Sequence, residues 1–299
     1  MLPIRSILVA TDLSEHSDPL VRAGAAIAEV VGAQLHLLHA FDLQPYVEER
    51  PSEGFPGRIA EAERAMDRQI LRAVPRSASI ASRQVVIHTV HKAILERAQV
   101  VSADLIVLGP HRARGLAQRF LGSTADRVVR TSPVPVLIIG DGLTLPLRRV
   151  VAPIDLSEPA RAALDHALWW TAALGTTAPE PRRAELRILH VVPRVYEDRE
   201  LLPSAERVGD EVRREIEEAL ARFPGEPKTE VTQEIRWGES PADEILRYAE
   251  EVRADLLVLG THGRGMIERA LIGSVASTVA RRASCPVLLV PPSLWRERK

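Results

Sequence analysis

Apolar runs alternate with amphipathic stretches along the whole chain. In the first half, runs rich in Val, Ile and Leu lie around 6–11, 34–40, 83–88, 104–109 and 135–140. Most of these runs lack the polar alternation of a strand that has one face in water. Continuous apolar runs of this kind are typical of strands buried on both faces of a parallel sheet.

The stretches between the runs carry the periodicity of helices. Segment 204–223 repeats an apolar residue every four positions, and segment 241–254 gathers its apolar residues on one face. Another helix is predicted to begin after Ser157, a favoured N-cap residue, and to end at Gly175. Strands and helices that alternate in this way predict an α/β fold.

The second half of the chain repeats the first. ADLIVLG at 103–109 returns as ADLLVLG at 254–260, and ILVATDLSE at 7–15 returns as VVAPIDLSE at 150–158. Most of the repeat keeps an offset of 151 residues, but the start is offset by 143, so the second copy carries extra residues around 177–184. The repeat predicts two tandem domains.

Each copy is therefore expected to form a doubly wound domain. We predict two five-stranded parallel sheets of strand order 3-2-1-4-5, flanked by helices, in domains spanning 1–143 and 147–299. The last strands, at 135–140 and 286–291, are candidates for pairing across a pseudo-twofold axis, which would make the chain a pseudo-dimer. Ligands in such folds bind beyond the carboxyl ends of the strands.

Glycine and serine follow the fourth strand of the second copy, in the stretch GTHGRGMIERALIGS at 260–274. Glycine lets the backbone approach a ligand closely, and the amides at a helix N-terminus welcome a phosphate. Asp155, at the end of the first strand, can accept hydrogen bonds from a ribose or an adenine amino group. An isolated G-x-x-G more often marks a plain loop with a helix cap, but its position between a buried strand and a helix favours a nucleotide site.

This pattern resembles the universal stress protein family. The shared features are G-x-x-G, nine residues and G-S, with the PIDLSE, GESPA and CPVLLV segments, and the resemblance covers essentially the whole chain. It implies an adenine nucleotide, usually ATP, with ADP or AMP as alternatives and Mg²⁺ as a companion of the phosphates. By position, the resemblance assigns the site in the second copy to Pro153, Asp155, Val191, Leu259, Gly260, His262, Gly263, Gly273, Ser274 and Val275.

The first copy departs from the pattern at Arg112, where the second glycine of the motif is expected. It keeps a weaker candidate site, made of Asp12, Ala40, Gly109, Arg112, Gly122 and Ser123. A non-glycine residue in a left-handed conformation costs about 1–2 kcal/mol. The Arg112 guanidinium either holds a phosphate itself or fills an abandoned pocket, and we favour impaired or absent ATP binding in this copy.

Composition narrows the function further. The net charge of −1 gives no reason to expect nucleic acid or a membrane surface as partner, and no apolar stretch is long enough to span a bilayer. The single Cys285 fits a reducing compartment and a core position, so a cytoplasmic protein is expected. His39 and His190 occupy equivalent positions and are interpreted as structural.

The chain shows no P-loop, no metal signature and no set of catalytic residues. We therefore expect a nucleotide-responsive stress or signalling module that is read by a protein partner. Two alternatives stay open, a slow ATPase or self-phosphorylating switch and a nucleotide-free interaction scaffold. A further homodimer of the whole chain also stays open.

Overall fold

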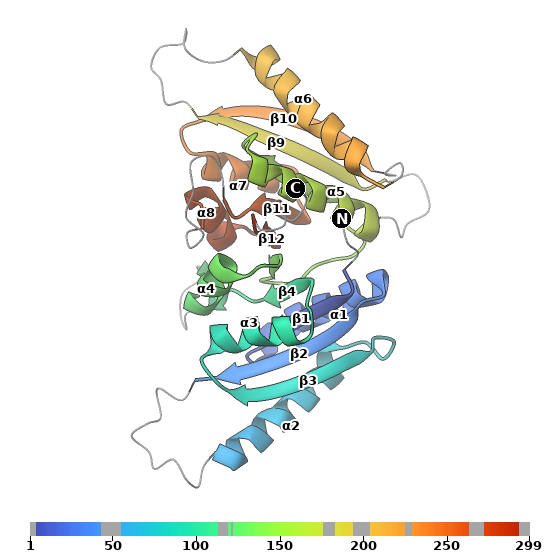
Figure 1. Cartoon of the computed structure of the whole chain (residues 1–299), viewed down its shortest axis with the longest axis vertical. Helices are drawn as coiled ribbons and strands as arrows, with labels where there is room; N and C mark the ends of the chain where they lie inside the picture. Colours follow the sequence, from blue (N-terminus) through green and yellow to red (C-terminus); the bar gives the residue numbers. More distant parts are fainter. Residues whose placement is uncertain are drawn as a thin grey trace.

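The computed structural model describes residues 4–42, 55–112, 119–120, 122–175, 183–193, 204–224, 229–262 and 272–292. Two similar sets of strands and helices follow each other along the chain and occupy the two ends of an elongated molecule (Figure 1). The set that ends with strand β7 is called domain 1 below, and the set that begins with strand β8 is called domain 2.

Domain 1 alternates strands and helices from its first residues onward. Its elements are β1 (Ser6–Ala10), the 3-10 turn η1 (Glu15–Ser17), α1 (Asp18–Val31), β2 (Gln34–Phe41), α2 (Phe55–Ala73), β3 (Ile80–Ile87), α3 (Val90–Val100), β4 (Leu105–Leu108), β5 (His111–Arg112), β6 (Arg119–Phe120), α4 (Ser123–Thr131) and β7 (Val136–Ile138).

Domain 2 repeats this order. Its elements are β8 (Arg149–Ile154), α5 (Glu158–Leu174), β9 (Glu185–Pro193), α6 (Ala205–Arg222), β10 (Glu230–Gly238), α7 (Pro241–Glu251), β11 (Leu256–Gly260), α8 (Ser274–Arg282) and β12 (Val287–Val290). The strands and helices predicted from the apolar pattern are therefore confirmed, with ends that shift by a few residues.

One continuous sheet runs through both domains. Its strand order is β10-β9-β8-β11-β12-β7-β4-β1-β2-β3. Each half is parallel and has the predicted order 3-2-1-4-5, since β1 pairs with both β2 and β4, and β8 pairs with both β9 and β11. The doubly wound prediction is confirmed for each domain.

The two halves meet through their last strands. Strand β12 pairs antiparallel with β7, and Leu288 lies opposite Leu137. Both leucines are fully buried. The predicted pairing of the fifth strands is confirmed, and it joins two five-stranded sheets into one of ten strands.

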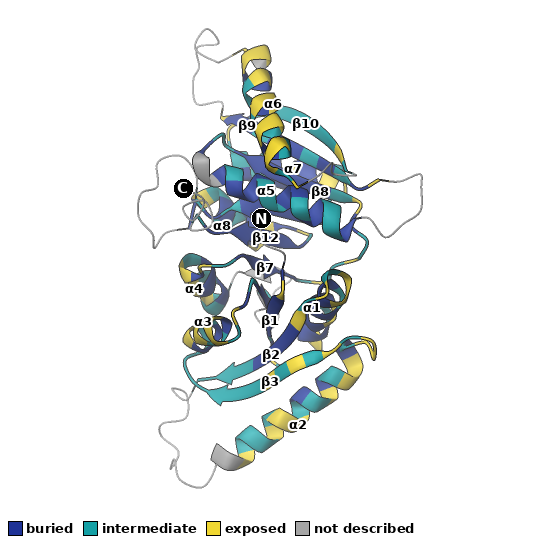
Figure 2. Ribbon diagram, turned by 45° about the vertical axis from the view of Figure 1, so that its right-hand side comes forward, coloured by how far each residue is buried: buried dark blue, intermediate teal, exposed yellow. Residues whose placement is uncertain are grey.

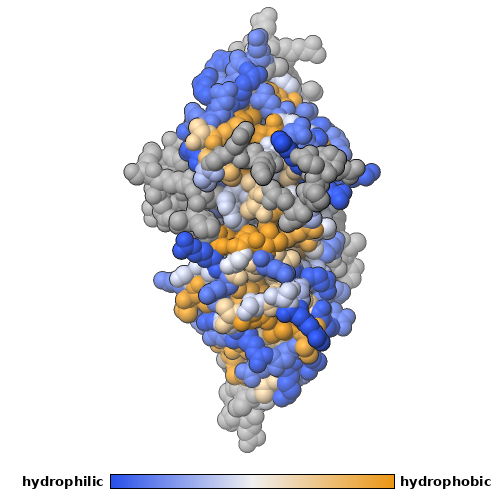
Figure 3. Space-filling model, turned by 90° about the vertical axis from the view of Figure 1, so that its right-hand side faces the viewer, coloured by the Kyte–Doolittle hydropathy of each residue, from blue (hydrophilic) through white to orange (hydrophobic). Residues whose placement is uncertain are grey.

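Two apolar layers cover the faces of this sheet, and both cross the seam between the domains. One layer contains buried residues of α1, α2, α5 and α6, and the other contains residues of α3, α4, α7 and α8. Figure 2 shows the buried strands in the middle, with exposed residues on the outer faces of α2 and α6. On the face shown in Figure 3, apolar side chains form a band across the middle of the molecule. The two domains therefore share one hydrophobic core on each face of the sheet.

Gly175 ends helix α5 as predicted. Its φ of −94° lies outside the left-handed region, so a positive φ does not explain the glycine. A Cβ atom at this position would lie 2.3 Å from the Cβ of Ala184 and 2.4 Å from the carbonyl oxygen of Thr171. Close packing against the start of the next strand therefore requires the glycine.

The shared core predicts that damage in domain 1 also destabilises domain 2. Leu137→Ala removes a fully buried side chain at the seam and should lower the free energy of unfolding by about 2–5 kcal/mol. All four tryptophans follow residue 160, so tryptophan fluorescence during urea unfolding reports on domain 2, whereas far-UV circular dichroism reports on the whole chain. We expect both transitions to move together to lower urea concentration.

Leu71→Ala is the matched control, because Leu71 is 85% exposed and its truncation should change stability by less than about 0.5 kcal/mol. A tryptophan transition that stays in place in Leu137→Ala would show that the domains unfold independently.

Candidate functional site

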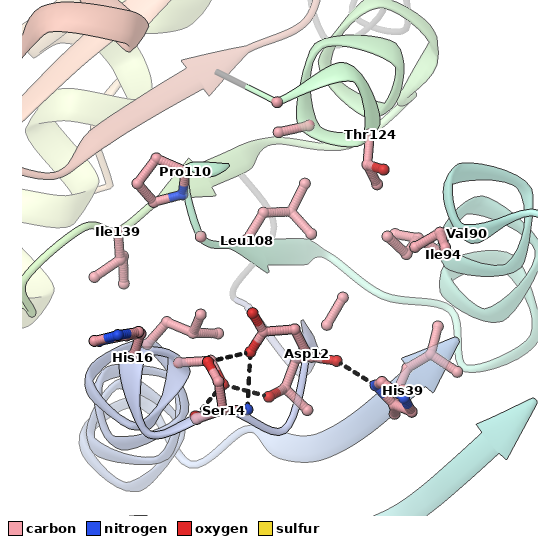
Figure 4. A pocket seen from close by; sticks show the side chains of 18 of the residues that line it. Asp12, Ser14, His16, His39, Val90, Ile94, Leu108, Pro110, Thr124 and Ile139 are labelled. Carbon is pink, nitrogen blue, oxygen red and sulfur yellow. Dashed lines mark hydrogen bonds between the residues drawn. The ribbon is translucent and has the colours of Figure 1, made fainter. Parts of the chain in front are cut away.

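A pocket of about 870 Å³ opens at the carboxyl ends of the strands of domain 1 (Figure 4). Its walls come from the segments that follow β1 and β4, from β2, and from the first turns of α3 and α4. The lining residues are Ala10, Thr11, Asp12, Ser14, His16, Ser17, Leu20, Leu38, His39, Ala40, Val90, Ile94, Leu108, Gly109, Pro110, Gly122, Ser123, Thr124, Ala125, Ile139 and Gly140. Asp12, Ala40, Gly109, Gly122 and Ser123 of the weaker site are among them, and the side chain of Arg112 lies outside the described part of the structure.

A tight turn presents the carboxylate of Asp12 to this pocket. Its Oδ1 accepts hydrogen bonds from the backbone amide of Ser14 at 3.0 Å and from the Ser14 hydroxyl at 2.6 Å. Burial raises the pKa of the Asp12 carboxyl. The two hydrogen bonds from Ser14, with smaller contributions from Ser17 and His39, lower the pKa by more than burial raises it. The net effect is a pKa below the ordinary value, so Asp12 is a carboxylate at neutral pH.

Domain 2 builds the same turn at Asp155. Its Oδ1 accepts hydrogen bonds from the amide of Ser157 at 3.1 Å and from the Ser157 hydroxyl. Ser157 immediately precedes helix α5, as predicted, but its side chain makes no cap bond to the helix. The hydroxyl is used by the Asp155 carboxylate instead, which corrects the reason given for this serine.

Both turns contain a strained leucine. Leu13 has a φ of 64° and Leu156 a φ of 59°, which lie in the left-handed region that leucine rarely adopts. This conformation costs about 1–2 kcal/mol for a residue with a Cβ atom. Strain that recurs at equivalent positions beside two carboxylates indicates that each turn is shaped for presenting its aspartate.

A buried polar network supports the turn in domain 1. The fully buried Gln69 of α2 accepts a hydrogen bond from the Thr11 hydroxyl at 2.8 Å. Its amide group donates to the Ser17 hydroxyl and to Asp18 Oδ1, both at 2.9 Å. Arg72 of the same helix donates to both carboxylate oxygens of Asp18. These bonds fix the segment between β1 and α1 against α2.

Two histidines tie the second strand of each domain to the first. His39 Nδ1 lies 2.8 Å from the carbonyl oxygen of Thr11, and His190 Nδ1 lies 2.8 Å from the carbonyl oxygen of Ile154. Thr11 and Ile154 directly precede the two site aspartates. The structural interpretation of these histidines therefore has a concrete basis in both domains.

Helices α4 and α8 begin where a phosphate would be expected. Gly122 and Gly273 are the N-cap residues, and among the described residues no side chain is found that caps either helix. Ser123 and Ser274 open the helices with exposed side chains. In domain 2 the loop before α8 is closed at its base, because the amide of Gly273 donates to the carbonyl oxygen of Thr261 at 2.8 Å.

Arg112 does not strain the backbone of domain 1 in the predicted way. It lies in strand β5, where it pairs with Arg119 of β6 in an antiparallel hairpin. Strand pairing holds the backbone in the extended region, so the left-handed cost expected for a non-glycine residue does not arise.

The predicted residues of domain 2 lie on neighbouring strands. Pro153 is in β8, Val191 is in β9, and Leu259 and Gly260 are the last residues of β11. Strand β8 lies between β9 and β11, so the carboxyl ends of these strands meet around Asp155. His262 follows β11, and its Nδ1 lies 2.8 Å from the hydroxyl of Thr261. Val275 is in the first turn of α8, and Gly263 lies outside the described residues.

Sequence reasoning missed Ser14, Ser157 and Gln69. The two serines were visible as the repeated DLSE segment, because a serine two residues after an aspartate is the pattern of an Asx turn. Gln69 gave no comparable signal, since a polar residue on the apolar side of a helix is recognised only once its partners are placed.

Cys285 takes no part in the site. Its side chain packs against the apolar layer that contains α7 and α8, and burial raises the pKa of its thiol to about 12. Within the described ranges, no three His, Cys, Asp or Glu residues are grouped in a way that could hold a metal ion. No helix in the same ranges is both long and apolar enough to cross a membrane.

The fold agrees with comparisons to known proteins. The model of the universal stress protein family matches residues 3–140 and again residues 146–291, so the chain belongs to this family and contains two of its domains in tandem.

Relatives with the same tandem length occur in mycobacteria. A universal stress protein of Mycolicibacterium smegmatis is 26% identical, over 96% of this chain and 97% of its own length. One from Mycobacterium tuberculosis is 27% identical over the same shares. A solved universal stress protein of Archaeoglobus fulgidus matches the fold with a TM-score of 0.67 at 22% identity and covers 96% of both chains.

The Asp18–Arg72 ion pair predicts acid sensitivity. The hydrogen bond from Arg72, followed by that from Gln69, lowers the pKa of the Asp18 carboxyl, although burial opposes the shift. A lowered folded-state pKa stabilises the fold above the unfolded pKa of about 3.9, and this stabilisation is lost as the pH falls through the folded pKa. Asp18→Asn should therefore lower Tm by a few degrees at pH 7.

Thermal melts from pH 7 downward check this prediction. The Tm difference between Asp18→Asn and the parent should shrink as the pH drops below 4. A difference that is constant across the pH range would mean that the charge of Asp18 contributes nothing.

Cys285 should resist thiol reagents in the folded protein. At pH 8 a thiol with a pKa of about 12 is almost entirely protonated, whereas an unfolded thiol with a pKa of about 8.5 is partly thiolate. We expect a disulfide reagent to modify the native protein at least about a hundredfold more slowly than the protein in guanidinium chloride. Equal rates in the two states would show that the thiol is accessible and reactive.

Proposed function

We propose that the chain binds an adenine nucleotide, ATP, principally in domain 2, and works as a nucleotide-responsive module in stress physiology. The observation that carries this proposal is the arrangement at the carboxyl edge of domain 2. There the Asp155 turn, the end of β11 at Gly260 and the uncapped start of α8 at Ser274 meet.

The chemistry of this edge is divided between its two sides. Asp155 offers hydrogen-bond acceptors, which suit the hydroxyl or amino groups of a nucleoside. The first amides of α8 and the Ser274 hydroxyl offer donors at the positive end of the helix dipole, which suit phosphates. A nucleotide has donors at one end and anionic acceptors at the other, so it matches both sides.

A regulatory role is supported better than rapid turnover. Efficient phosphoryl transfer requires metal ligands and a group that positions the nucleophile. When ATP binds, Mg²⁺ would enter the site together with the nucleotide and would be held mainly by the phosphate oxygens. Bound nucleotide stabilises whatever conformation it selects, by about 2.7 kcal/mol at a hundredfold excess over Kd. We infer that this energy changes a surface that a protein partner recognises.

A single charge at the start of α8 tests the proposed site. Ser274→Asp places a carboxylate where the phosphates would lie, and like charges at short range repel strongly. An acidic residue in the first turn of a helix is favourable for the helix itself, so the fold should be preserved. We expect the variant to bind ATP at least tenfold more weakly in isothermal titration calorimetry at the site of higher affinity.

Ser77→Asp is the matched control. Ser77 is exposed in the turn before β3, at the opposite end of the strands from the site, and it undergoes the same change of charge. If Ser274→Asp retained the affinity of the parent, the phosphates could not lie at α8 and the site in domain 2 would be ruled out.

A further inference from the structure

The ring of His39 has one nitrogen committed to the fold and one available to a ligand. The carbonyl oxygen of Thr11, 2.8 Å from Nδ1, can only accept a hydrogen bond. Nδ1 of the neutral ring therefore carries the hydrogen, and Nε2 is left with a lone pair. No hydrogen bond to Nε2 from another residue is found in the described part of the chain.

His39 lines the pocket of domain 1 together with Asp12 (Figure 4). Two hydrogen-bond acceptors from neighbouring strands, a carboxylate and an imidazole nitrogen, thus border the same cavity. Ser14 satisfies Oδ1 of Asp12, but no cation of the described residues forms an ion pair with this carboxylate.

The opposite wall of the cavity has the complementary character. Helix α4 begins there after Gly122 without a side-chain cap, and Ser123 and Thr124 both line the pocket. This wall offers amide and hydroxyl donors. The cavity therefore has an acceptor side and a donor side, and its volume of about 870 Å³ falls in the range of small-molecule sites.

We propose that His39 determines the specificity of a second nucleotide site in domain 1, in which its Nε2 accepts a hydrogen bond from an N–H or O–H group of the nucleoside. The inference rests on the proposed function for the class of ligand, and it adds a specificity-determining residue to the weaker candidate site of domain 1. Asp12 Oδ2 accepts a second donor of the same nucleoside, and α4 receives the phosphates. The donor that meets His39 is either the adenine amino group or a ribose hydroxyl.

His190 shows why the residue type alone does not carry the proposal. It makes the same Nδ1 bond to domain 2, so a histidine at this position has a structural use in both domains. A decisive test must keep the Nδ1 bond and remove the Nε2 acceptor. Asparagine does this, because its side-chain amide nitrogen can occupy the place of Nδ1 and it has no atom in the place of Nε2.

The experiment uses the full-length chain with Ser274→Asp, so that binding to domain 1 is measured alone. In this background we expect one ATP per chain by calorimetry, and His39→Asn should weaken ATP binding at least tenfold with little change in Tm. His190→Asn makes the same change in domain 2 and measures what loss of the ring costs the fold.

Three analogues identify the donor. Purine riboside triphosphate lacks the adenine amino group, 2′-deoxy-ATP lacks the 2′-hydroxyl of the ribose, and 3′-deoxy-ATP lacks the 3′-hydroxyl. The analogue without the contacted donor should bind the His39 protein more weakly than ATP does, and should lose no further affinity in His39→Asn.

Three results would overturn the proposal. One is unchanged ATP affinity in His39→Asn, and another is an equal loss of affinity for ATP and for all three analogues. The third is the absence of ATP binding in the Ser274→Asp background while the parent binds one ATP. That last result would leave the proposed site in domain 2 intact. Binding that persists in Ser274→Asp with the affinity of the parent would instead remove the site in domain 2.

Discussion

The antiparallel pairing of β7 with β12 is the constraint on which the rest of the molecule depends. It converts two sheets of five strands into one of ten, and it places Leu137 opposite Leu288 in a fully buried seam. Both apolar layers then run across the seam without interruption. The two domains therefore share their apolar layers, although the sequence repeats one pattern in its two halves.

The same pairing sets the relation between the two candidate sites. Because β7 and β12 run in opposite directions, the carboxyl ends of the two parallel sets point in opposite directions at the seam. Helices α4 and α8, whose first residues belong to the two candidate sites, are joined across the seam by Arg281 and Asp126, whose side chains approach to 3.7 Å. Asp126 also pairs with Arg130 of its own helix.

The sequence predicted the architecture well because the repeat supplied the same information twice. Apolar runs located the strands of both sheets, and the turn residues around Asp12 and Asp155 were already visible in the repeated DLSE. It failed where a residue's role depends on a distant partner. The hydroxyl of Ser157 serves Asp155 rather than the helix, and Gln69 becomes meaningful only when α2 packs over Thr11. The sequence argument assumed that Arg112 takes the left-handed backbone conformation of the glycine expected there, whereas Arg112 lies in a strand and pairs with Arg119.

Domain 1 is therefore more than a degenerate copy. It holds its β1–α1 segment with a buried polar network, while at the positions equivalent to Thr11 and Ser17 domain 2 has the apolar residues Ile154 and Ala160. A network of this kind is favourable only when its members are satisfied, and Gln69 is bonded through both its oxygen and its nitrogen. The network therefore fixes the segment between β1 and α1, which forms part of the wall of the domain 1 pocket.

Native mass spectrometry of the full chain at saturating ATP tests the central claim most directly, since it counts the nucleotides bound per chain. The account predicts two nucleotides on the parent and one on Ser274→Asp. A parent that stays free of nucleotide at every ATP concentration would contradict it and would make the chain a nucleotide-free scaffold.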